Sequence, residues 1–363
     1  MDFNRQRLLL FGIRGLGIFS FIILLVAKCP YARVLNSLCV DDMVYGNTYR
    51  DAKLRPFKVR LPDPVGDVPA ISDPKRPGAH RLFFIGDCAS QAHYGMKALV
   101  LQLSERLREP IYYDHLDDLL NPACLFQEEA PHSQAPGRVL VVDSVEFALV
   151  RRLSKSRPCP APVSAKARPF ESWAPVVWSN KIINVLFLDI ERRLHFLLTN
   201  SKLTAPFVES WNTALFARFC LLPASEPMVS LAPPFLFSST ETSPILSSSF
   251  YAPHDDALVL TIAKNLEEIS NTLRSQYNVE LIFLPVPNKF TIYHRFVTAD
   301  RYDNFLPRLD EELRRRGVRT VRLYEPFLRS QEFVYHPSDS NWNRYGASIT
   351  LEEVVRAIEE ARR

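Results

Sequence analysis

Apolar and polar positions alternate in blocks along the C-terminal half of the chain, as a helix, a strand, a second helix and a second strand. Apolar residues that recur every three or four positions predict helices over 258–273 and 305–313. Short apolar runs predict strands at Val279–Val286 and Val318–Tyr324. Gly317 is expected to end the second helix. The pair Thr350 and Glu353 has the spacing of a capping box, which predicts the start of a last helix.

Three further apolar runs nearer the N-terminus have the length of strands: Arg81–Ile85, Val139–Val142 and Ile183–Ile190. Strands that alternate with helices favour right-handed crossover connections and a mainly parallel sheet. The pattern therefore predicts an α/β domain with helices on both faces of its sheet.

The first residues form an apolar run from Leu8 to Ala27 that only Arg14 interrupts. At about 1.5 Å per residue in a helix, such a run crosses the roughly 30 Å hydrocarbon core of a bilayer. Arg5 and Arg7 favour a cytoplasmic N-terminus and an exported body. Because no small-x-small cleavage site follows, an uncleaved signal anchor over residues 1–28 is favoured over a signal peptide or a buried hydrophobic helix. We expect a single-pass inner-membrane protein with its body in the periplasm or extracellular space.

Proline-rich segments suggest how the rest of the chain is divided. Residues 29–80 are rich in Pro and charge and are expected to form a stalk or covering segment before a domain over 81–363. Pro and Ser crowd again over 223–254, where we expect a loop or insertion, with Ser238–Ser249 a polar loop rather than an element.

The composition excludes several classes of function. The 44 basic and 40 acidic residues nearly balance, and no basic-aromatic stripe is present, so nucleic acid is not an expected partner. The six cysteines are scattered without a Cys-x-x-Cys pair or a His spaced as a metal partner, so no metal and no cofactor are predicted. The sequence still allows one or two disulfides between these cysteines.

Polar residues follow four of the predicted strands. In open α/β sheets the ligand crevice lies beyond the carboxyl ends of the strands. That rule selects the pairs Asp143-Ser144, Glu191-Arg192 and Asn288-Lys289, and the loop that contains Asp339. All four segments are expected to line one rim of the sheet.

These segments contain motifs that resemble a known family. The motifs are Pro285-Val-Pro-Asn288-Lys289 with Tyr293, Asp339-Ser-Asn341-Trp342, the strand that ends in Asp143-Ser144, and Asn184 to Glu191-Arg192. They resemble the AlgJ/AlgX-like SGNH-hydrolase family of polysaccharide O-acetyltransferases, over roughly residues 138–200 and 255–350. The resemblance implies a flavodoxin-like SGNH fold, although in AlgJ and AlgX the aspartate motif precedes the serine.

The resemblance also implies roles for several residues. Ser144, after Asp143 in the nucleophile turn, would attack an acyl donor, Asp339 would orient a base, and Asn288 or backbone amides would stabilise the oxyanion. Asn341 stands at the position of the family's basic histidine and has no titratable nitrogen. Either another histidine substitutes, with His336 and His294 nearest in sequence, or catalysis has been lost.

Other readings of the same residues stay open. Ser144 is equally suited to cap a helix. The turn Gly86-Asp87-Cys88 also follows a predicted strand and offers Cys88 as a thiol nucleophile, or as a small buried hydrophobe. Trp342 and Tyr293 suit sugar stacking or rim packing. Lys289 is expected near the substrate, and Glu191-Arg192 form either a substrate contact or a structural charge pair.

Three hypotheses follow. The first is a membrane-anchored enzyme that transfers or removes acetyl groups on an envelope polysaccharide. The second is a non-catalytic relative that binds glycan or a partner in the same assembly. The third is a cysteine-dependent hydrolase that uses Cys88. The expected partners are a polysaccharide, the membrane through the N-terminal helix, and a membrane acyl-transfer protein.

Overall fold

The computed structural model describes residues 45–63, 65, 80–86, 96–115, 121–126, 136–155, 199–223, 227–247 and 249–363. The chain divides into two compact units, one of Met1–Asp42 with Ser164–Phe219 and one of Met43–Val163 with Cys220–Arg363. The described part of the first unit is residues 199–219, which include helix α8 (Ala205–Phe219). All other described elements belong to the second unit.

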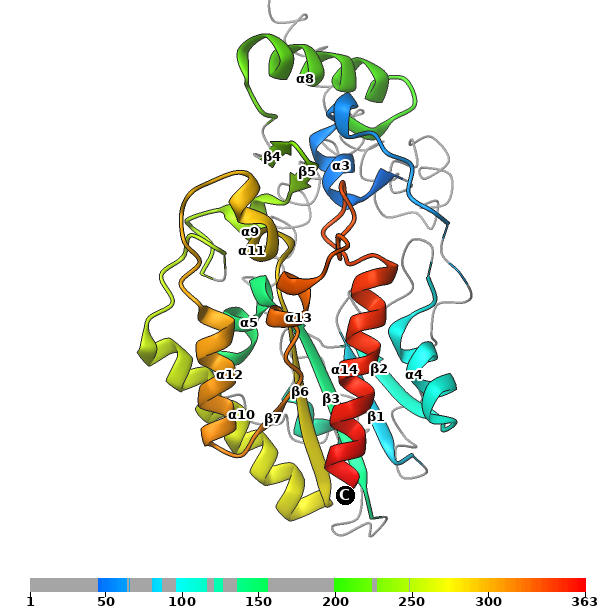
Figure 1. The fold of residues 1–363 in the computed structure, drawn as a ribbon, viewed down its shortest axis with the longest axis vertical. Coiled ribbons are helices and arrows are strands. Elements are labelled where there is room, and N and C mark those ends of the chain that lie inside the picture. Colours follow the sequence, from blue (N-terminus) through cyan, green and yellow to red (C-terminus); the bar gives the residue numbers. More distant parts are fainter. Residues whose placement is uncertain are drawn as a thin grey trace, which may run out of the picture. The chain divides into compact units, whose positions relative to one another are not determined.

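The second unit is built on a five-stranded sheet (Figure 1). Its strands lie in the order β2 (Ile111–His115), β1 (Leu82–Gly86), β3 (Arg138–Val145), β6 (Val279–Val286) and β7 (Arg319–Thr320). Every neighbouring pair in this sheet is parallel. The predicted α/β class with a mainly parallel sheet is therefore confirmed.

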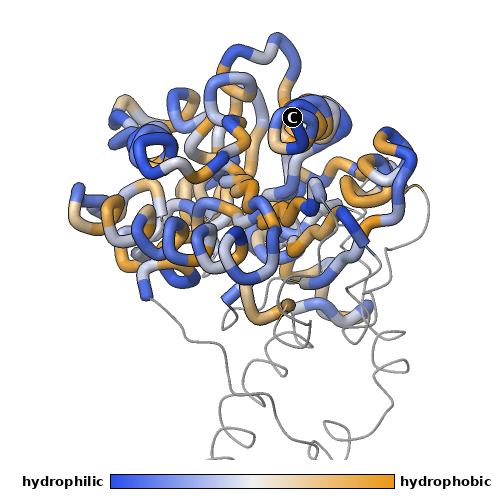
Figure 2. Tube along the Cα trace, turned by 90° about the horizontal axis from the view of Figure 1, so that it is seen from below, coloured by the Kyte–Doolittle hydropathy of each residue, from blue (hydrophilic) through white to orange (hydrophobic). Residues whose placement is uncertain are grey.

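The central strands β1 and β3 are buried along their whole length, because helices pack against the sheet. Helix α14 (Arg344–Arg362) packs against β3, β6 and α4 (Leu99–Leu107). Helix α10 (Asp256–Tyr277) packs against β6, α5 (Glu146–Leu153) and α12 (Phe305–Arg315). Figure 2 shows apolar segments between the helical layers, as parallel sheets covered on both faces require.

The ends of two predicted helices lie where sequence signals place them. Asp255 caps α10 by accepting a hydrogen bond from the Leu258 amide at 2.7 Å. Gly317 follows α12 with a φ of 72°, and the Val318 amide donates back to the Leu313 carbonyl at 3.0 Å. This is the hydrogen bond that closes a helix through a left-handed glycine.

Two predicted boundaries were wrong. The strand expected over Val318–Tyr324 pairs only at Arg319–Thr320, and helix α13 (Tyr324–Arg329) begins where the strand was expected to end. Helix α14 begins at Arg344 rather than near Thr350, because Asn343 caps it by accepting from the Tyr345 and Gly346 amides. Thr350 lies inside the helix, where its hydroxyl donates to the Gly346 carbonyl.

The proline-rich segments contain ordered elements. Helix α3 (Asn47–Ala52) and the 3-10 turn η2 (Arg55–Phe57) bury Tyr49 and Phe57, and both contact the strand β5 (Pro234–Phe237). Within 223–254, β4 (Met228–Leu231) and β5 (Pro234–Phe237) form an antiparallel pair, followed by the short helix α9 (Ser239–Thr242). The Ser238 hydroxyl caps α9, which is why this serine-rich stretch is helical at its start.

The remaining elements are short: the 3-10 turns η5 (Pro122–Phe126) and η8 (His294–Phe296), and helix α11 (Lys289–Tyr293). Among the described residues, no helix combines the length and the apolar character needed to cross a bilayer. The predicted anchor over Leu8–Ala27 and the predicted strand Ile183–Ile190 lie outside the described residues.

Candidate functional site

The strand order reverses direction between β1 and β3. The chain passes from β1 outward to β2, returns to β3 on the other side of β1, and continues to β6. In open α/β sheets the ligand crevice lies at such a switch point, beyond the carboxyl ends of the strands. The same edge holds the segments that follow β3 and β6, because Ser144 pairs in register with Pro285.

The segments after β3 and β6 are joined by a reciprocal pair of hydrogen bonds. The Phe147 amide in the first turn of α5 donates to Asn288 Oδ1 at 3.1 Å. The Asn288 amide at the start of α11 donates to Glu146 Oε2 at 2.8 Å. Each segment therefore caps the N-terminus of the other's helix, in place of the side-chain cap that Val145 cannot provide.

Glu146 is the centre of this junction. Its Oε2 also accepts from the Thr291 hydroxyl at 2.7 Å, and its Oε1 accepts from the Tyr302 hydroxyl at 2.6 Å. Complete burial raises the pKa of Glu146, and these hydrogen bonds oppose that rise. Sequence analysis missed Glu146, although an acidic residue in the first turn after a strand is a recognisable capping signal.

Ser144 lies inside the end of β3 and does not cap α5. Its side chain is almost completely buried, with 1% of the residue exposed. The Arg152 guanidinium, two turns along α5, donates to Ser144 Oγ at 3.0 Å. Asp143 is also fully buried. The hydroxyl predicted to attack an acyl donor is thus packed against an arginine in the interior.

Both carboxylate oxygens of Asp339 accept hydrogen bonds from nearby amides. Oδ1 accepts from the Asn341 backbone amide at 2.8 Å and from Asn341 Nδ2 at 2.7 Å. Oδ2 accepts from the backbone amide of Asn47, at the start of α3, at 2.6 Å. The side-chain amide of Asn341 therefore bonds to the aspartate at the position where the resemblance implies an imidazole.

The first turn of α3 docks on the Asp339 loop. Asn47 exchanges two further hydrogen bonds with Ser340, and the Tyr49 amide donates to the Ser338 carbonyl at 3.0 Å. Gly46 has a φ of 98°, and a Cβ there would lie 2.4 Å from the Ser338 carbonyl oxygen. Only glycine fits this close approach.

Lys289 holds the Asp339 loop against β5. Its Nζ donates to the carbonyls of Leu236, Pro337 and Asp339 at 2.6, 2.7 and 3.1 Å. Burial lowers the pKa of Lys289 to about 7, and the nearby carboxylates of Glu241 and Asp339 oppose this shift. Burial likewise raises the pKa of Glu241 to about 7. Lys289 is inside the protein rather than at a substrate surface.

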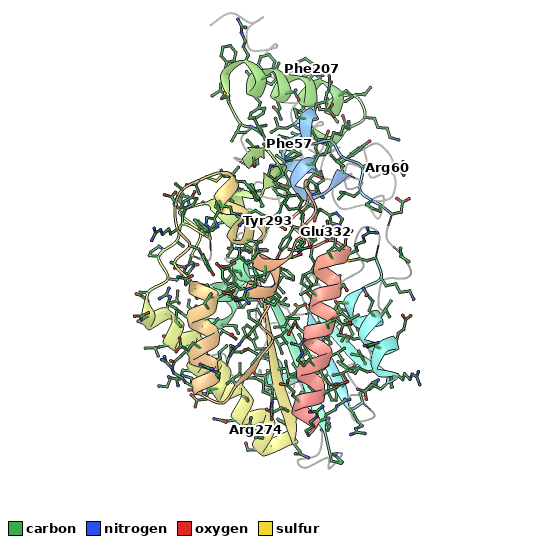
Figure 3. All side chains as sticks on the ribbon, viewed as in Figure 1. Phe57, Arg60, Phe207, Arg274, Tyr293 and Glu332 are labelled. Atoms are coloured by element: carbon green, nitrogen blue, oxygen red, sulfur yellow. The ribbon has the colours of Figure 1, made fainter. Side chains whose placement is uncertain are left out.

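The two aromatic residues proposed to stack on sugars are also interior. Tyr293 lies flat against Phe235 with ring centroids 4.8 Å apart, and its hydroxyl accepts from the Val334 amide (Figure 3). Burial raises the pKa of Tyr293 to about 12. Trp342 is 1% exposed and packs edge-on against Phe327. Their placement fits the packing alternative, because neither ring presents a face to solvent.

The predicted rim residues are thus brought together only in part. Asn288 contacts the helix that follows Ser144, and its neighbour Lys289 contacts the backbone of Asp339. Ser144 bonds to Arg152, whereas Asp339 bonds to Asn47 and Asn341. His336 is nearly buried and its backbone amide donates to the Asn341 carbonyl. Cys88, Glu191 and Arg192 lie outside the described residues.

A histidine that sequence analysis did not select is paired with a carboxylate. His254 Nδ1 lies 2.8 Å from Asp303 Oδ2, and its ring stacks on Phe305 at 4.2 Å between centroids. The side chain of His254 is fully buried. No sequence spacing indicates this pair, because its members lie 49 residues apart in the chain.

Comparison with known proteins supplies one match. Residues 236–363, from β5 to the last residue, match the family model described as the SGNH hydrolase-like domain of acetyltransferase AlgX. The matched residues include Asn288, Asp339 and Asn341 but not Ser144. No curated protein and no solved structure matches the chain. Over residues 236–363 the resemblance seen in the sequence motifs is confirmed, because this part of the chain is similar to the AlgX SGNH hydrolase-like domain.

Proposed function

We propose that this protein is a non-catalytic member of its family that acts by binding within a system for polysaccharide O-acetylation. The observation that carries the proposal is the Asp339–Asn341 pair, in which an amide bonds to the aspartate that would orient the base. An amide cannot accept the proton of an attacking hydroxyl. Removal of the histidine from a serine hydrolase costs about 10⁶-fold in rate, on the order of 8 kcal/mol.

The surroundings of Ser144 support the same conclusion. A serine nucleophile needs a base within hydrogen-bond reach and an open path for its substrate. Ser144 Oγ instead receives a hydrogen bond from Arg152, which is a permanent donor, and 1% of the residue is exposed. Hydrogen bonds hold Ser144 and Asp339 in place. Among the described residues, however, none of the hydrogen-bond partners named above for these two side chains is a base that could take a proton from Ser144.

We propose that the protein acts at the cell envelope. The predicted anchor over residues 1–28 would hold the protein in the inner membrane with its body exported. Cys124 is disulfide-bonded, which is typical of proteins in oxidising compartments. A polysaccharide and a membrane acyl-transfer protein are the proposed partners.

Acyl-enzyme chemistry provides the test. The full chain, Ser144→Ala and Asn341→His are incubated with a fluorophosphonate probe and with p-nitrophenyl acetate. We expect the wild-type protein to show no labelling and no hydrolysis beyond Ser144→Ala, and Asn341→His to remain inactive because Ser144 stays buried. A covalent adduct on Ser144, or hydrolysis lost in Ser144→Ala, would overturn the proposal.

The topology favours one alternative, a cysteine-dependent hydrolase. β1 ends at Gly86 next to β3, at the switch point of the sheet, and Asp87-Cys88 come next in the sequence, outside the described residues. The exposed free thiol of Cys220 provides a reference for ordinary reactivity. Iodoacetamide at neutral pH, followed by peptide mapping, distinguishes the two. If Cys88 is alkylated much faster than Cys220, the result favours this alternative. If Cys88 is alkylated more slowly than Cys220, the alternative is removed.

A further inference from the structure

Helix α8, which Figure 1 labels, exposes an apolar face. The exposed fractions are 91% for Leu203, just before the helix, 72% for Phe207, 57% for Trp211 and 64% for Phe219. Phe207, Trp211 and Ala214 follow one another at spacings of four and three residues, so they share one side of the helix. Phe207 is labelled on this helix in Figure 3.

The polar residues of α8 are distributed in the opposite way from those of an ordinary surface helix. The helix contains one acidic residue, Glu209, and it is buried. Basic residues stand at the two ends, Lys202 in the preceding turn and Arg218 in the last turn, and both are exposed. An exposed face of aromatic and small residues, with cations at its ends and no carboxylate, matches the surface of a bilayer that contains anionic lipids.

The chain position of α8 also favours a membrane. α8 belongs to the compact unit that includes Met1–Asp42, and that segment contains the apolar run from Leu8 to Ala27. If this run anchors the protein, a helix of the same unit is expected near the bilayer. Trp and Phe are the side chains enriched where a protein meets the headgroup region.

We infer that α8 is an interfacial helix that lies on the membrane, with Phe207 and Trp211 inserted among the lipid headgroups and acyl chains and Lys202 and Arg218 at the phosphates. The helix has 15 residues, too few to cross the roughly 30 Å hydrocarbon core, so it lies in the interface plane. This inference goes beyond the proposed binding function; it rests on the proposed anchor over residues 1–28 but not on the absence of catalysis. A second copy of the chain is the competing occupant of this face.

Quenching of Trp211 fluorescence by brominated lipids tests the inference. The full chain is incorporated into vesicles of phosphatidylcholine and phosphatidylglycerol, with or without bromine on the acyl chains. Trp211 is one of four tryptophans, so its share is obtained by subtraction of the Trp211→Phe signal. We expect bromolipid to remove at least half of the Trp211 emission and Phe207→Glu to reduce that quenching at least twofold.

A matched control and a competing outcome complete the experiment. Gln276→Glu adds the same charge to an exposed position of α10 and should leave the quenching unchanged. Trp211 emission that bromolipid leaves unaffected would overturn the inference. So would concentration-dependent crosslinking through α8 in the absence of lipid, because it would assign this face to a second copy.

Discussion

Replacement of Glu146 tests the junction between β3 and β6 directly. This fully buried carboxylate accepts three hydrogen bonds, from the Asn288 amide, the Thr291 hydroxyl and the Tyr302 hydroxyl. In Glu146→Ala all three buried donors lose their acceptor, at about 1–2 kcal/mol each. The expected loss is therefore about 3–6 kcal/mol of unfolding free energy, a large share of the roughly 5–15 kcal/mol that stabilises a typical protein.

Glu146→Gln keeps the shape of the side chain and gives the sharper measurement. Its carbonyl oxygen can still accept from Asn288 and Thr291, but its NH₂ group then faces the Tyr302 hydroxyl, which already accepts from the Leu306 amide. One charge-assisted bond is lost, so we expect a loss of about 1–3 kcal/mol. For a domain of this size that lowers the melting temperature by about 2–4 °C per kcal/mol.

Thermal unfolding followed by circular dichroism measures both variants. Glu352→Gln on the exposed side of α14 is the matched control and should change the stability by less than about 0.5 kcal/mol. If Glu146→Gln melts together with Glu352→Gln, the junction does not hold the two strand ends. A stabilised Glu146→Gln would mean that the burial cost of the carboxylate exceeds the value of its hydrogen bonds.

Two further substitutions test the Asp339 loop. Burial lowers the pKa of Lys289 to about 7. Between about pH 7 and 10, Lys289 therefore binds more protons in the unfolded chain than in the folded protein. Its contribution to stability rises with pH over this range. Lys289→Met should remove that rise in urea midpoints measured at pH 7.5 and 9.5, and an unchanged slope would contradict the assignment. Gly46→Ala should lower the melting temperature more than Gly317→Ala. Both glycines have positive φ, but only a Cβ at Gly46 meets the Ser338 carbonyl. Equal losses of melting temperature would mean that α3 does not depend on this contact.

The central strands β1, β3 and β6 could be predicted because each is an apolar run that requires no distant partner to be recognised, whereas β2 was not selected. Gly317 and Asp255 likewise carry local signals that fix helix ends. The start of α14 was misplaced because Thr350 and Glu353 imitate a capping box, while Asn343 is the cap that the structure uses. The last predicted strand pairs with β6 over only two residues, because the extent of a strand depends on its neighbours in the fold as well as on its own propensity.

The candidate functional site was harder to predict from the sequence than the strands of the sheet. The motifs correctly selected Asn288, Lys289 and Asp339 as residues of one region, since each follows a strand or matches a family pattern. Their roles depend on partners that are far away in the chain: Glu146 is 142 residues from Asn288, and Asn47 is 292 residues from Asp339. Such pairings are fixed by tertiary packing, which no local periodicity encodes.

The contact between Asn47 and Asp339 determines how the protein can be divided for laboratory work. A fragment that starts at residue 81, just before the first strand, would lack α3 and leave one oxygen of the buried Asp339 carboxylate without its hydrogen bond from Asn47. It would also remove the buried side chains of Tyr49 and Phe57, whose elements contact β5. Any expression boundary that preserves the family domain must therefore lie before Gly46, even though the family match itself starts at residue 236.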